Sequence, residues 1–443
     1  MELNISPLDN RYKNKCEPLR EYVSDFGFNK IRYEVELKYF QFLLNILYKY
    51  EPNESINKLI DEFSVSDLRC IREIEKKTNH DVKSIEYFIK NQLENKHFEY
   101  IVKYKEFVHF ALTSQDINSV SNTLLLKRSV ENVLIPKIRS IISQLRQLSD
   151  KWTQSVMMSK THGQPAVTTS MGKEIKVFIE RLENQFDLLI SFNYTTKIGG
   201  AVGNLNAHYF CYPEINWDKE FNSFLTESFN VSRNKYTTQI DHYDNFSEIF
   251  DIIKRINNIL IDLNQDFWTY ISHNYFILKK KEGEVGSSTM PHKVNPINFE
   301  NSEGNLYMAN SILNMMSQKL PISRLQRDLT DSTITRNIGV ALSYSLLAYQ
   351  SLEAGLSKIE INTITLDTDL DNNWSILTEA IQCIMKTELK DNAYEAMKEV
   401  SRGNKLNKDD YINIVNNLDI SSMNKNKLLN LTPSTYTGNL FLD

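Results

Sequence analysis

The sequence predicts a mainly α-helical fold, and two observations support this prediction. First, residues that interrupt helices are scarce: the 443 residues include only 13 glycines and 10 prolines, whereas average usage would give roughly 31 and 22. Second, apolar residues recur every three or four positions over several long stretches, which is the spacing of one face of a helix. Because 41% of the residues are hydrophobic, a chain of this length can bury a substantial core.

The chain up to about residue 105 is predicted to form a small domain of short helices. Turns rich in asparagine and lysine interrupt it at residues 51–55 and 91–96. Asn79 is expected to cap a helix that begins near Val82, because asparagine is a favoured residue at that position.

The middle of the chain is predicted to form a bundle of long helices. The apolar spacing continues through residues 130–148, 175–189 and 246–267, and such stripes are buried only when helices pack against one another. The last part of the chain returns to shorter periods and is predicted to form a third, helical domain. The predicted domains are residues 1–105, 106–355 and 356–443.

Composition, charge and cysteine spacing exclude several classes of protein. The net charge is −5, with 51 Lys and Arg against 56 Asp and Glu, so we expect no basic surface that attracts nucleic acid. No apolar run approaches the roughly 20 residues that span a bilayer, and the first residues lack the pattern of a signal peptide. Four widely separated cysteines favour reduced thiols. We therefore expect a cytoplasmic protein that binds neither membrane nor nucleic acid.

Four polar clusters interrupt the apolar pattern, and the first is KTHGQPA at residues 160–166. It places His162 in a turn that Gly163 and Pro165 are expected to form at the entry of a helix. A lone histidine is more often structural than catalytic. An imidazole held on a turn nevertheless titrates near neutral pH, which suits a general acid.

The second cluster, GEVGSSTMPHKVNP at residues 283–296, joins two helical segments and combines two glycines, three hydroxyl side chains and Lys293. It is either a flexible polar loop or a mobile lid. In the second case its N–H groups, hydroxyls and Lys293 would bind a carboxylate or a phosphate. The spacing does not fit a GxxxxGK[ST] phosphate loop.

The third and fourth clusters are VHFALTSQDIN at residues 108–118 and TNHDV at residues 78–82. Thr113 and Ser114 are expected to open a helix as capping residues. The free N–H groups at such a helix start would also suit a bound carboxylate. In the fourth cluster, Asp81 is a candidate to orient the ring of His80.

Motifs for metals and for common cofactors are absent from the sequence. No pair of histidines has the HExxH or Hx3–5H spacing of a zinc site. The GxSxG elbow of many hydrolases and the GxGxxG turn of dinucleotide-binding proteins are also missing. We therefore expect no metal and no organic cofactor.

Taken together, the clusters resemble the fumarase/aspartase superfamily, whose mobile loop reads close to GSSxMPxKxNP. Residues 286–296, GSSTMPHKVNP, match this pattern at every fixed position. THGQPA, with SPLDNRY at 6–12, NHDVK at 79–83 and QRDLTDST at 326–333, is similar to the branch that cleaves adenylosuccinate. The resemblance runs from about residue 3 to beyond 430. One departure is Asn10, where this branch often has glycine.

This resemblance implies an enzyme that eliminates fumarate from adenylosuccinate to give AMP, and from SAICAR to give AICAR, in purine biosynthesis. It also implies a homotetramer with a 20-helix core and with active sites shared by three subunits. Two alternatives stay open. The first is another lyase of the superfamily, such as an argininosuccinate lyase or a fumarase, and the second is a non-catalytic helical scaffold.

The resemblance also implies a role for individual residues. It assigns the base to Ser287, with Ser288 as the rival, and the acid to His162. It assigns the succinyl carboxylates to Thr113, Ser114, Lys293 and Asn295. It assigns the nucleotide phosphate to Arg11, Tyr12, Arg327, Ser332 and Arg336. Further substrate contacts fall to Asn79, His80, Asp81, Gln239, Asn301 and Thr333. His80 and His109 are candidates to orient the acid, and His292 is expected to be structural.

Overall fold

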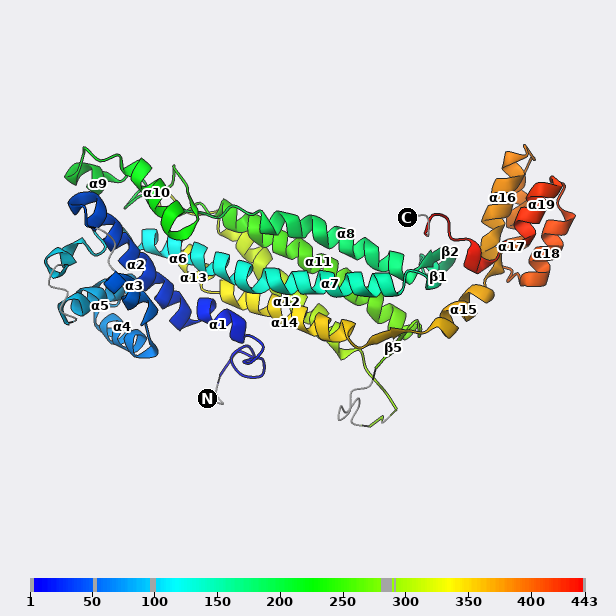
Figure 1. Ribbon diagram of the computed structural model, residues 1–443, viewed down its shortest axis with the longest axis horizontal. Coiled ribbons are helices and arrows are strands. Elements are labelled where there is room, and N and C mark those ends of the chain that lie inside the picture. Colours follow the sequence, from blue (N-terminus) through cyan, green and yellow to red (C-terminus); the bar gives the residue numbers. More distant parts are fainter. Residues whose placement is uncertain (1–3, 51–53, 96–100, 280–288, 291, 441–443) are drawn as a thin grey trace. The chain divides into compact units, whose positions relative to one another are not determined.

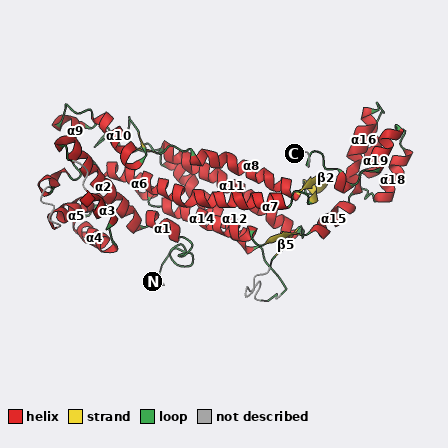
Figure 2. Cartoon of the chain, in the orientation of Figure 1, coloured by secondary structure: helices red, strands yellow, loops and turns green. Residues whose placement is uncertain are grey.

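The computed structural model describes residues 4–50, 54–95, 101–279, 289–290 and 292–440. It is mainly helical with a few short strands, as Figure 1 and Figure 2 show, which confirms the predicted fold class. Within the described residues, no helix is both long and apolar enough to cross a membrane.

The chain divides into two compact units. Unit 1 comprises residues 1–139, 185–258 and 302–350, and unit 2 comprises residues 140–184, 259–301 and 351–443. Each unit combines one predicted flanking domain with part of the predicted central bundle. The division into three domains therefore stays a prediction.

Five long helices contribute residues to both units. They are α7 (Ile135–Lys151), α8 (Met171–Ile190), α11 (Asp244–Ser272), α12 (Ile297–Lys319) and α14 (Ile338–Leu356). Three of them, α7, α8 and α11, lie in the stretches where the apolar spacing predicts long helices, although a π turn forms residues 130–134 before α7 begins. In α11 the predicted stripe is buried, including Ile249, Ile253 and Ile256. The periodicity is thus a reliable guide where one helix face meets the core.

The remaining elements of unit 1 are mostly short. They are α1 (Glu17–Val23), α2 (Asp25–Tyr48), α3 (Glu54–Asp61), α4 (Val65–Thr78), α5 (Asp81–Asn95), a 3-10 helix (Val102–Phe107), α6 (Ser114–Ser129), a π turn (Val130–Leu134), β3 (Thr195–Thr196), α9 (Asn206–Cys211), α10 (Trp217–Phe229), β4 (Ser232–Arg233) and α13 (Thr330–Thr335). One apolar cluster of this unit joins α2, α3 and α5 around Tyr33, Phe40 and Ile85.

The elements confined to unit 2 lie mainly in the last quarter of the chain. They are β1 (Val156–Thr161), β2 (Gln164–Ser170), β5 (Phe276–Leu278), β6 (Ile359–Ile361), α15 (Thr363–Asp371), α16 (Thr378–Thr387), α17 (Ala393–Ser401), α18 (Lys408–Asn417) and α19 (Ser422–Leu429), with 3-10 turns at Trp374–Leu377 and Pro433–Thr435. Leu377, Ile381 and Tyr411 belong to an apolar cluster in this unit.

The prediction that only short helices precede residue 105 is wrong for α2, which has 24 residues. Ser24 caps its start by accepting a hydrogen bond from the N–H of Gly27, and Lys49 ends it in a left-handed conformation. The helix buries polar side chains such as Arg32 and Glu36 together with its apolar ones. This mixture hides the one-sided apolar stripe on which the sequence prediction relies.

The turn at His162 joins two strands and is not the entry of a helix, which corrects the prediction for this segment. Strands β1 and β2 pair in antiparallel fashion, with Thr161 opposite Gln164. His162 and Gly163 form the two-residue loop, and both have positive φ, 54° and 73°. Such a loop matches the twist of a β-hairpin. The β-branched run that follows the turn favours strand, so α8 begins only at Met171.

Candidate active site

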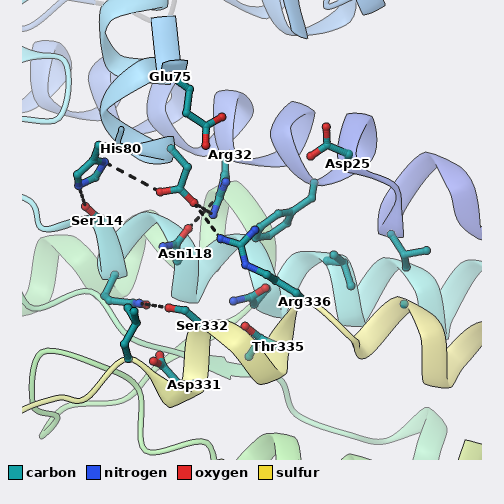
Figure 3. Close-up of a pocket in the computed structure, with 18 of the residues that line it drawn as sticks. Asp25, Arg32, Glu75, His80, Ser114, Asn118, Asp331, Ser332, Thr335 and Arg336 are labelled. Carbon is teal, nitrogen blue, oxygen red and sulfur yellow. Dashed lines mark hydrogen bonds and ion pairs between the residues drawn. The ribbon is translucent and has the colours of Figure 1, made fainter. Parts of the chain in front are cut away.

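Unit 1 contains a cavity of about 560 Å³, a size that suits a small organic ligand. Its walls come from α2, the junction of α4 and α5, α6 and α13, and Figure 3 shows their polar side chains pointing toward one another. The predicted substrate contacts that line it are Asn79, His80, Asp81, Ser114, Arg327, Ser332 and Arg336. The structure thus brings together residues that are far apart in the sequence.

The N-terminus of α6 lies at this cavity. Thr113 is the capping residue, and its N–H donates to Oδ2 of Asp116 at 2.8 Å, which forms part of a capping box. The expectation that Thr113 and Ser114 open a helix is therefore confirmed. A helix start carries N–H groups without intrahelical partners and a partial positive charge, so it favours a bound carboxylate.

His80 contacts both the start of α5 and the start of α6. The N–H of Lys83 donates to its Nδ1 at 3.1 Å, and its Nε2 lies 3.3 Å from Ser114 Oγ. Asp81 does not orient this ring by a hydrogen bond, because its Oδ1 is 4.0 Å from Nδ1. The local backbone and Ser114 position the imidazole instead.

Asn79 ends α4 and does not cap α5, which corrects the prediction for this residue. Its φ is 48°, and its N–H donates to the carbonyl of Glu75 at 2.7 Å. Asparagine tolerates this left-handed conformation better than most residues. The sharp turn that results directs His80 toward α6.

Asp81 is the partner of two arginines that differ in exposure. Arg32 Nη2 donates to its Oδ2 at 2.8 Å, and only 6% of the Arg32 side chain is exposed. Arg336 Nη2 lies 3.7 Å from the same oxygen, but 69% of its side chain is exposed. Burial opposes ionisation of Asp81, yet Arg32 and its other partners lower the pKa of this carboxyl. Of the two arginines, Arg336 is therefore the one whose guanidinium faces solvent.

His109 forms an ion pair with a glutamate of α2. Its Nδ1 lies 2.6 Å from Oε1 of Glu36, whose side chain has 0% exposure. Burial disfavours the charged ring, but Glu36 and two further carboxylates together raise the pKa of His109. His109 does not line the cavity, although it lies only four residues before Thr113 in the chain. Its role in orienting the acid therefore stays a prediction.

Arg327 lies just before α13 and lines the cavity. Its Nη1 donates to Gln239 Oε1 at 3.2 Å, and its Nη2 donates to Ser332 Oγ at 3.3 Å. Its Nε is buried and has no hydrogen-bond partner among the described residues. Because a guanidinium offers several N–H groups in a fixed plane, this arginine suits a phosphate or carboxylate. Gln239 and Arg327 also line a second, more open hollow of about 580 Å³.

Several residues of the cavity were not predicted from the sequence. They are Arg32, Gln115, Asn118 and Asp331, among others. Gln115 and Asn118 lie within a polar cluster that the sequence indicates, but they received no role. No signal in the sequence singles out Arg32, because Lys30 and Glu34 are charged residues of the same segment.

Five predicted contacts of unit 1 do not line the cavity in this structure, namely Arg11, Tyr12, Thr113, Gln239 and Thr333. Thr113 caps α6 next to Ser114, and Gln239 accepts a hydrogen bond from Arg327. The Arg11 side chain is exposed, and Tyr12 packs in a small cluster with Leu8 and Leu347. Thr333 lies on α13, where its carbonyl accepts a hydrogen bond from Asn337. Their roles stay predictions.

The remaining predicted residues belong to unit 2 or lie outside the described residues. His162 is exposed at the hairpin turn. Asn301 Oδ1 accepts a hydrogen bond from Ser351 at 2.8 Å, and the N–H of Lys293 donates to the carbonyl of Met290 at 3.1 Å. Unit 2 also contains Asn295, whereas Ser287 and Ser288 are outside the described residues.

The described part of the chain contains no group of three or more His, Cys, Asp or Glu side chains that could hold a metal ion. The cavity offers a helix start, an imidazole and three arginines, and the carboxylates of Asp25, Glu75, Asp81 and Asp331 also line it. Asp81 is paired with Arg32, and Asp25 and Glu75 are paired with Arg72, so Arg327 and Arg336 supply positive charge for a ligand. This combination suits a ligand with several negative charges.

Comparison with known proteins identifies relatives over nearly the whole chain. The family described as lyase matches residues 48–310, and the family described as adenylosuccinate lyase C-terminal matches residues 323–437. The chain is 47% identical to an adenylosuccinate lyase of Dictyostelium discoideum and 42% identical to one of Escherichia coli, in each case over 98% of this chain and 96% of that protein. A fumarate lyase from Mesorhizobium, 13% identical, has the same fold, with a TM-score of 0.74 over 96% of this chain and 95% of that chain.

Proposed function

The chain belongs to the adenylosuccinate lyase family, and we propose that the cavity of unit 1 binds the substrate of that reaction. The reaction eliminates fumarate from adenylosuccinate to give AMP, and the same elimination would convert SAICAR to AICAR. The observation that carries the proposal is the convergence of the α6 start, His80 and two arginines on one cavity, in a chain with such relatives.

The charges of the substrate match the groups around the cavity. A succinyl group carries two carboxylates, and the start of α6 at Thr113 and Ser114 offers N–H groups and hydroxyls to one of them. Arg327, Ser332 and Arg336 would bind the nucleotide phosphate, because guanidinium groups match phosphate oxygens.

The chemical step needs a base, an acid and stabilisation of charge. The base removes a proton from the carbon beside a carboxylate, the carbon–nitrogen bond breaks, and the acid protonates the departing nitrogen. We assign the base to Ser287 and the acid to His162. Lys293 and Asn295 would stabilise the doubly charged intermediate, since fixed donors act most strongly where charge develops.

The geometry of the hairpin supports the role of His162. The imidazole lies on a two-residue turn between paired strands, so its backbone is held on both sides. It is also exposed, as an acid that must reach a substrate has to be. Both features support the assignment of the acid to His162.

We also propose that the chain forms a homotetramer with shared active sites and acts in the cytoplasm. On α12, Tyr307, Met308 and Met315 are large apolar side chains that are exposed in the single chain. Tyr307 and Met308 are adjacent, and Met315 lies about two helical turns beyond Met308, so the three fall on one side of the helix. Burial of this side against another copy would remove the apolar surface from water.

The ultraviolet absorbance of adenylosuccinate tests the proposed function directly. The purified chain should convert it to AMP and fumarate, and His162→Ala should lose most of the activity while it remains folded. Absence of turnover by the unaltered chain would contradict the proposal. In that case argininosuccinate and fumarate are the next substrates to test, and inactivity toward all three would favour a scaffold.

A further inference from the structure

A completely buried ion pair holds the start of α6 in place. Asp116 Oδ1 lies 2.6 Å from Lys197 Nζ, and both side chains have 0% exposure. Lys197 Nζ also donates to the carbonyl of Gly200 at 2.8 Å. The lysine therefore joins the α6 carboxylate to the loop that follows β3.

Asp116 accepts hydrogen bonds from two segments of the chain. Its Oδ2 accepts the N–H of Thr113 at 2.8 Å, while its Oδ1 accepts the N–H of Gly199 at 2.8 Å and that of Gly200 at 3.2 Å. An amide side chain could not replace it, because an amide has only one acceptor oxygen. The carboxylate thus sets the position of the helix start relative to residues 197–203.

The same loop contacts the segment that holds Arg327. Gln239 Nε2 donates to the carbonyl of Ala201 at 3.0 Å, and Gln239 Oε1 accepts from Arg327. Gly203 has a φ of 84°, and a Cβ atom at this position would lie 2.1 Å from the carbonyl oxygen of Thr237. The loop is therefore in close contact with residues 237–239 as well as with α6.

The stability of the fold does not by itself explain this ion pair. Removal of two charges from water is costly, and replacement of a whole buried pair by apolar side chains is often neutral or stabilising. Between them, the two side chains also hold the N–H groups of Thr113, Gly199 and Gly200 and the carbonyl of Gly200. Such a pair is better explained by the geometry that it imposes.

We propose that Lys197 and Asp116 are positioning residues that hold the α6 start and, through loop 197–203 and Gln239, Arg327 at the spacing that the substrate requires. This inference rests on the proposed function, in which Thr113 and Ser114 bind a carboxylate and Arg327 binds the phosphate. Neither Lys197 nor Asp116 touches the substrate in this arrangement.

The test compares Lys197→Met with a matched variant on α6. Arg128 near the C-terminal end of α6 forms a two-bond ion pair with Glu34, at 2.7 and 2.8 Å. For adenylosuccinate, Lys197→Met should raise KM and lower kcat/KM by roughly 10²-fold, because small displacements of binding groups have effects of this size. Arg128→Met should lower the melting temperature and leave KM unchanged.

A double variant, Asp116→Asn with Lys197→Met, separates positioning from folding. It leaves no unpaired buried charge, so its melting temperature should lie above that of Lys197→Met. Its KM should stay raised, because the single acceptor oxygen of the introduced amide cannot serve both Thr113 and Gly199. If Lys197→Met does not fold, KM and kcat/KM are measured on the double variant instead.

Three results would overturn the inference while the unaltered chain remains active. They are an unchanged KM in Lys197→Met, an equal rise of KM in Arg128→Met, and normal kinetics in the double variant. Inactivity of the unaltered chain toward adenylosuccinate would instead contradict the proposed function and this inference with it.

Discussion

Arg32 and Asp81 form an ion pair at the wall of the cavity, with 2.8 Å between Nη2 and Oδ2. The same arginine donates through Nε to Asn118 Oδ1 at 2.9 Å. One buried guanidinium therefore joins α2 to the start of α5 and to α6. Its charge is already paired, so it supports the wall of the cavity and leaves Arg336 to meet a ligand.

Replacement of this arginine should destabilise the fold. Arg32→Met leaves the carboxylate of Asp81 without its main partner, and loss of one member of a buried pair costs about 3 kcal/mol. Urea unfolding followed by circular dichroism measures the change. Arg336→Met is the control: its side chain is largely exposed, so stability should hardly change. Equal losses in the two variants would contradict this account of Arg32.

The pair of His109 and Glu36 should make stability depend on pH. Burial opposes the charge of His109, but Glu36 and neighbouring carboxylates raise its pKa above the usual 6.5. The stabilisation is therefore fully present below about pH 6.5 and is lost as the pH rises through the raised pKa. Melting temperatures of the unaltered chain and of His109→Asn should differ most at low pH and converge as the pH rises above the raised pKa of His109. A difference that grows with pH would have the wrong sign.

Gly203 should not tolerate a side chain. Gly203→Ala combines a left-handed backbone with a clash against the carbonyl of Thr237, so we expect a loss of about 3 kcal/mol. Gly403 provides the matched control, because its φ of 81° is similar and its surroundings are open. Gly403→Ala should cost only about 1 kcal/mol. Denaturant unfolding measures both, and equal losses would show that contact with Thr237 is unimportant.

The two serines of the 283–296 loop should have unequal roles. Ser287→Ala should lower kcat roughly 10³-fold, the scale of a lost acid–base group, with little change in substrate binding. Ser288→Ala should keep most of the activity. Steady-state kinetics with adenylosuccinate measure both variants. The opposite ranking would assign the base to Ser288.

Shared active sites would allow two inactive variants to restore activity together. Arg327→Met alters unit 1, and His162→Ala alters unit 2. If a site takes these residues from different subunits, mixed tetramers contain some sites with neither change. Activity should appear after the two proteins are unfolded and refolded together, and a mixture that stays inactive despite forming tetramers would argue against sharing.

The sequence predicts helices well where a single face is buried and less well elsewhere. The stripe of α11 is regular because one side of that helix meets the core. In contrast, α2 also buries Arg32 and Glu36, so its pattern is mixed. The hairpin at His162 escaped prediction because strand pairing joins two segments, and neither alone indicates its partner.

Several residues of the candidate site could be singled out from the sequence, because Asn79, His80, Ser114 and Arg327 occur in short, distinctive motifs and also line the cavity. The residues that hold this site in place could not be predicted, since they come from distant positions in the sequence. Arg32 is 49 residues from Asp81, and Gly199 is 83 residues from Asp116. Only the folded chain brings such pairs together, and a single sequence contains no record of which distant residues meet.

The backbone at His162 has a consequence for how this protein can change over evolutionary time. A positive φ of 54° favours asparagine and histidine alike. His162→Asn would therefore keep the hairpin and remove the proposed acid, and a single-nucleotide change suffices to make it. Loss of catalysis at this position does not require loss of structure, so a duplicated gene could retain a stable helical protein for a different use.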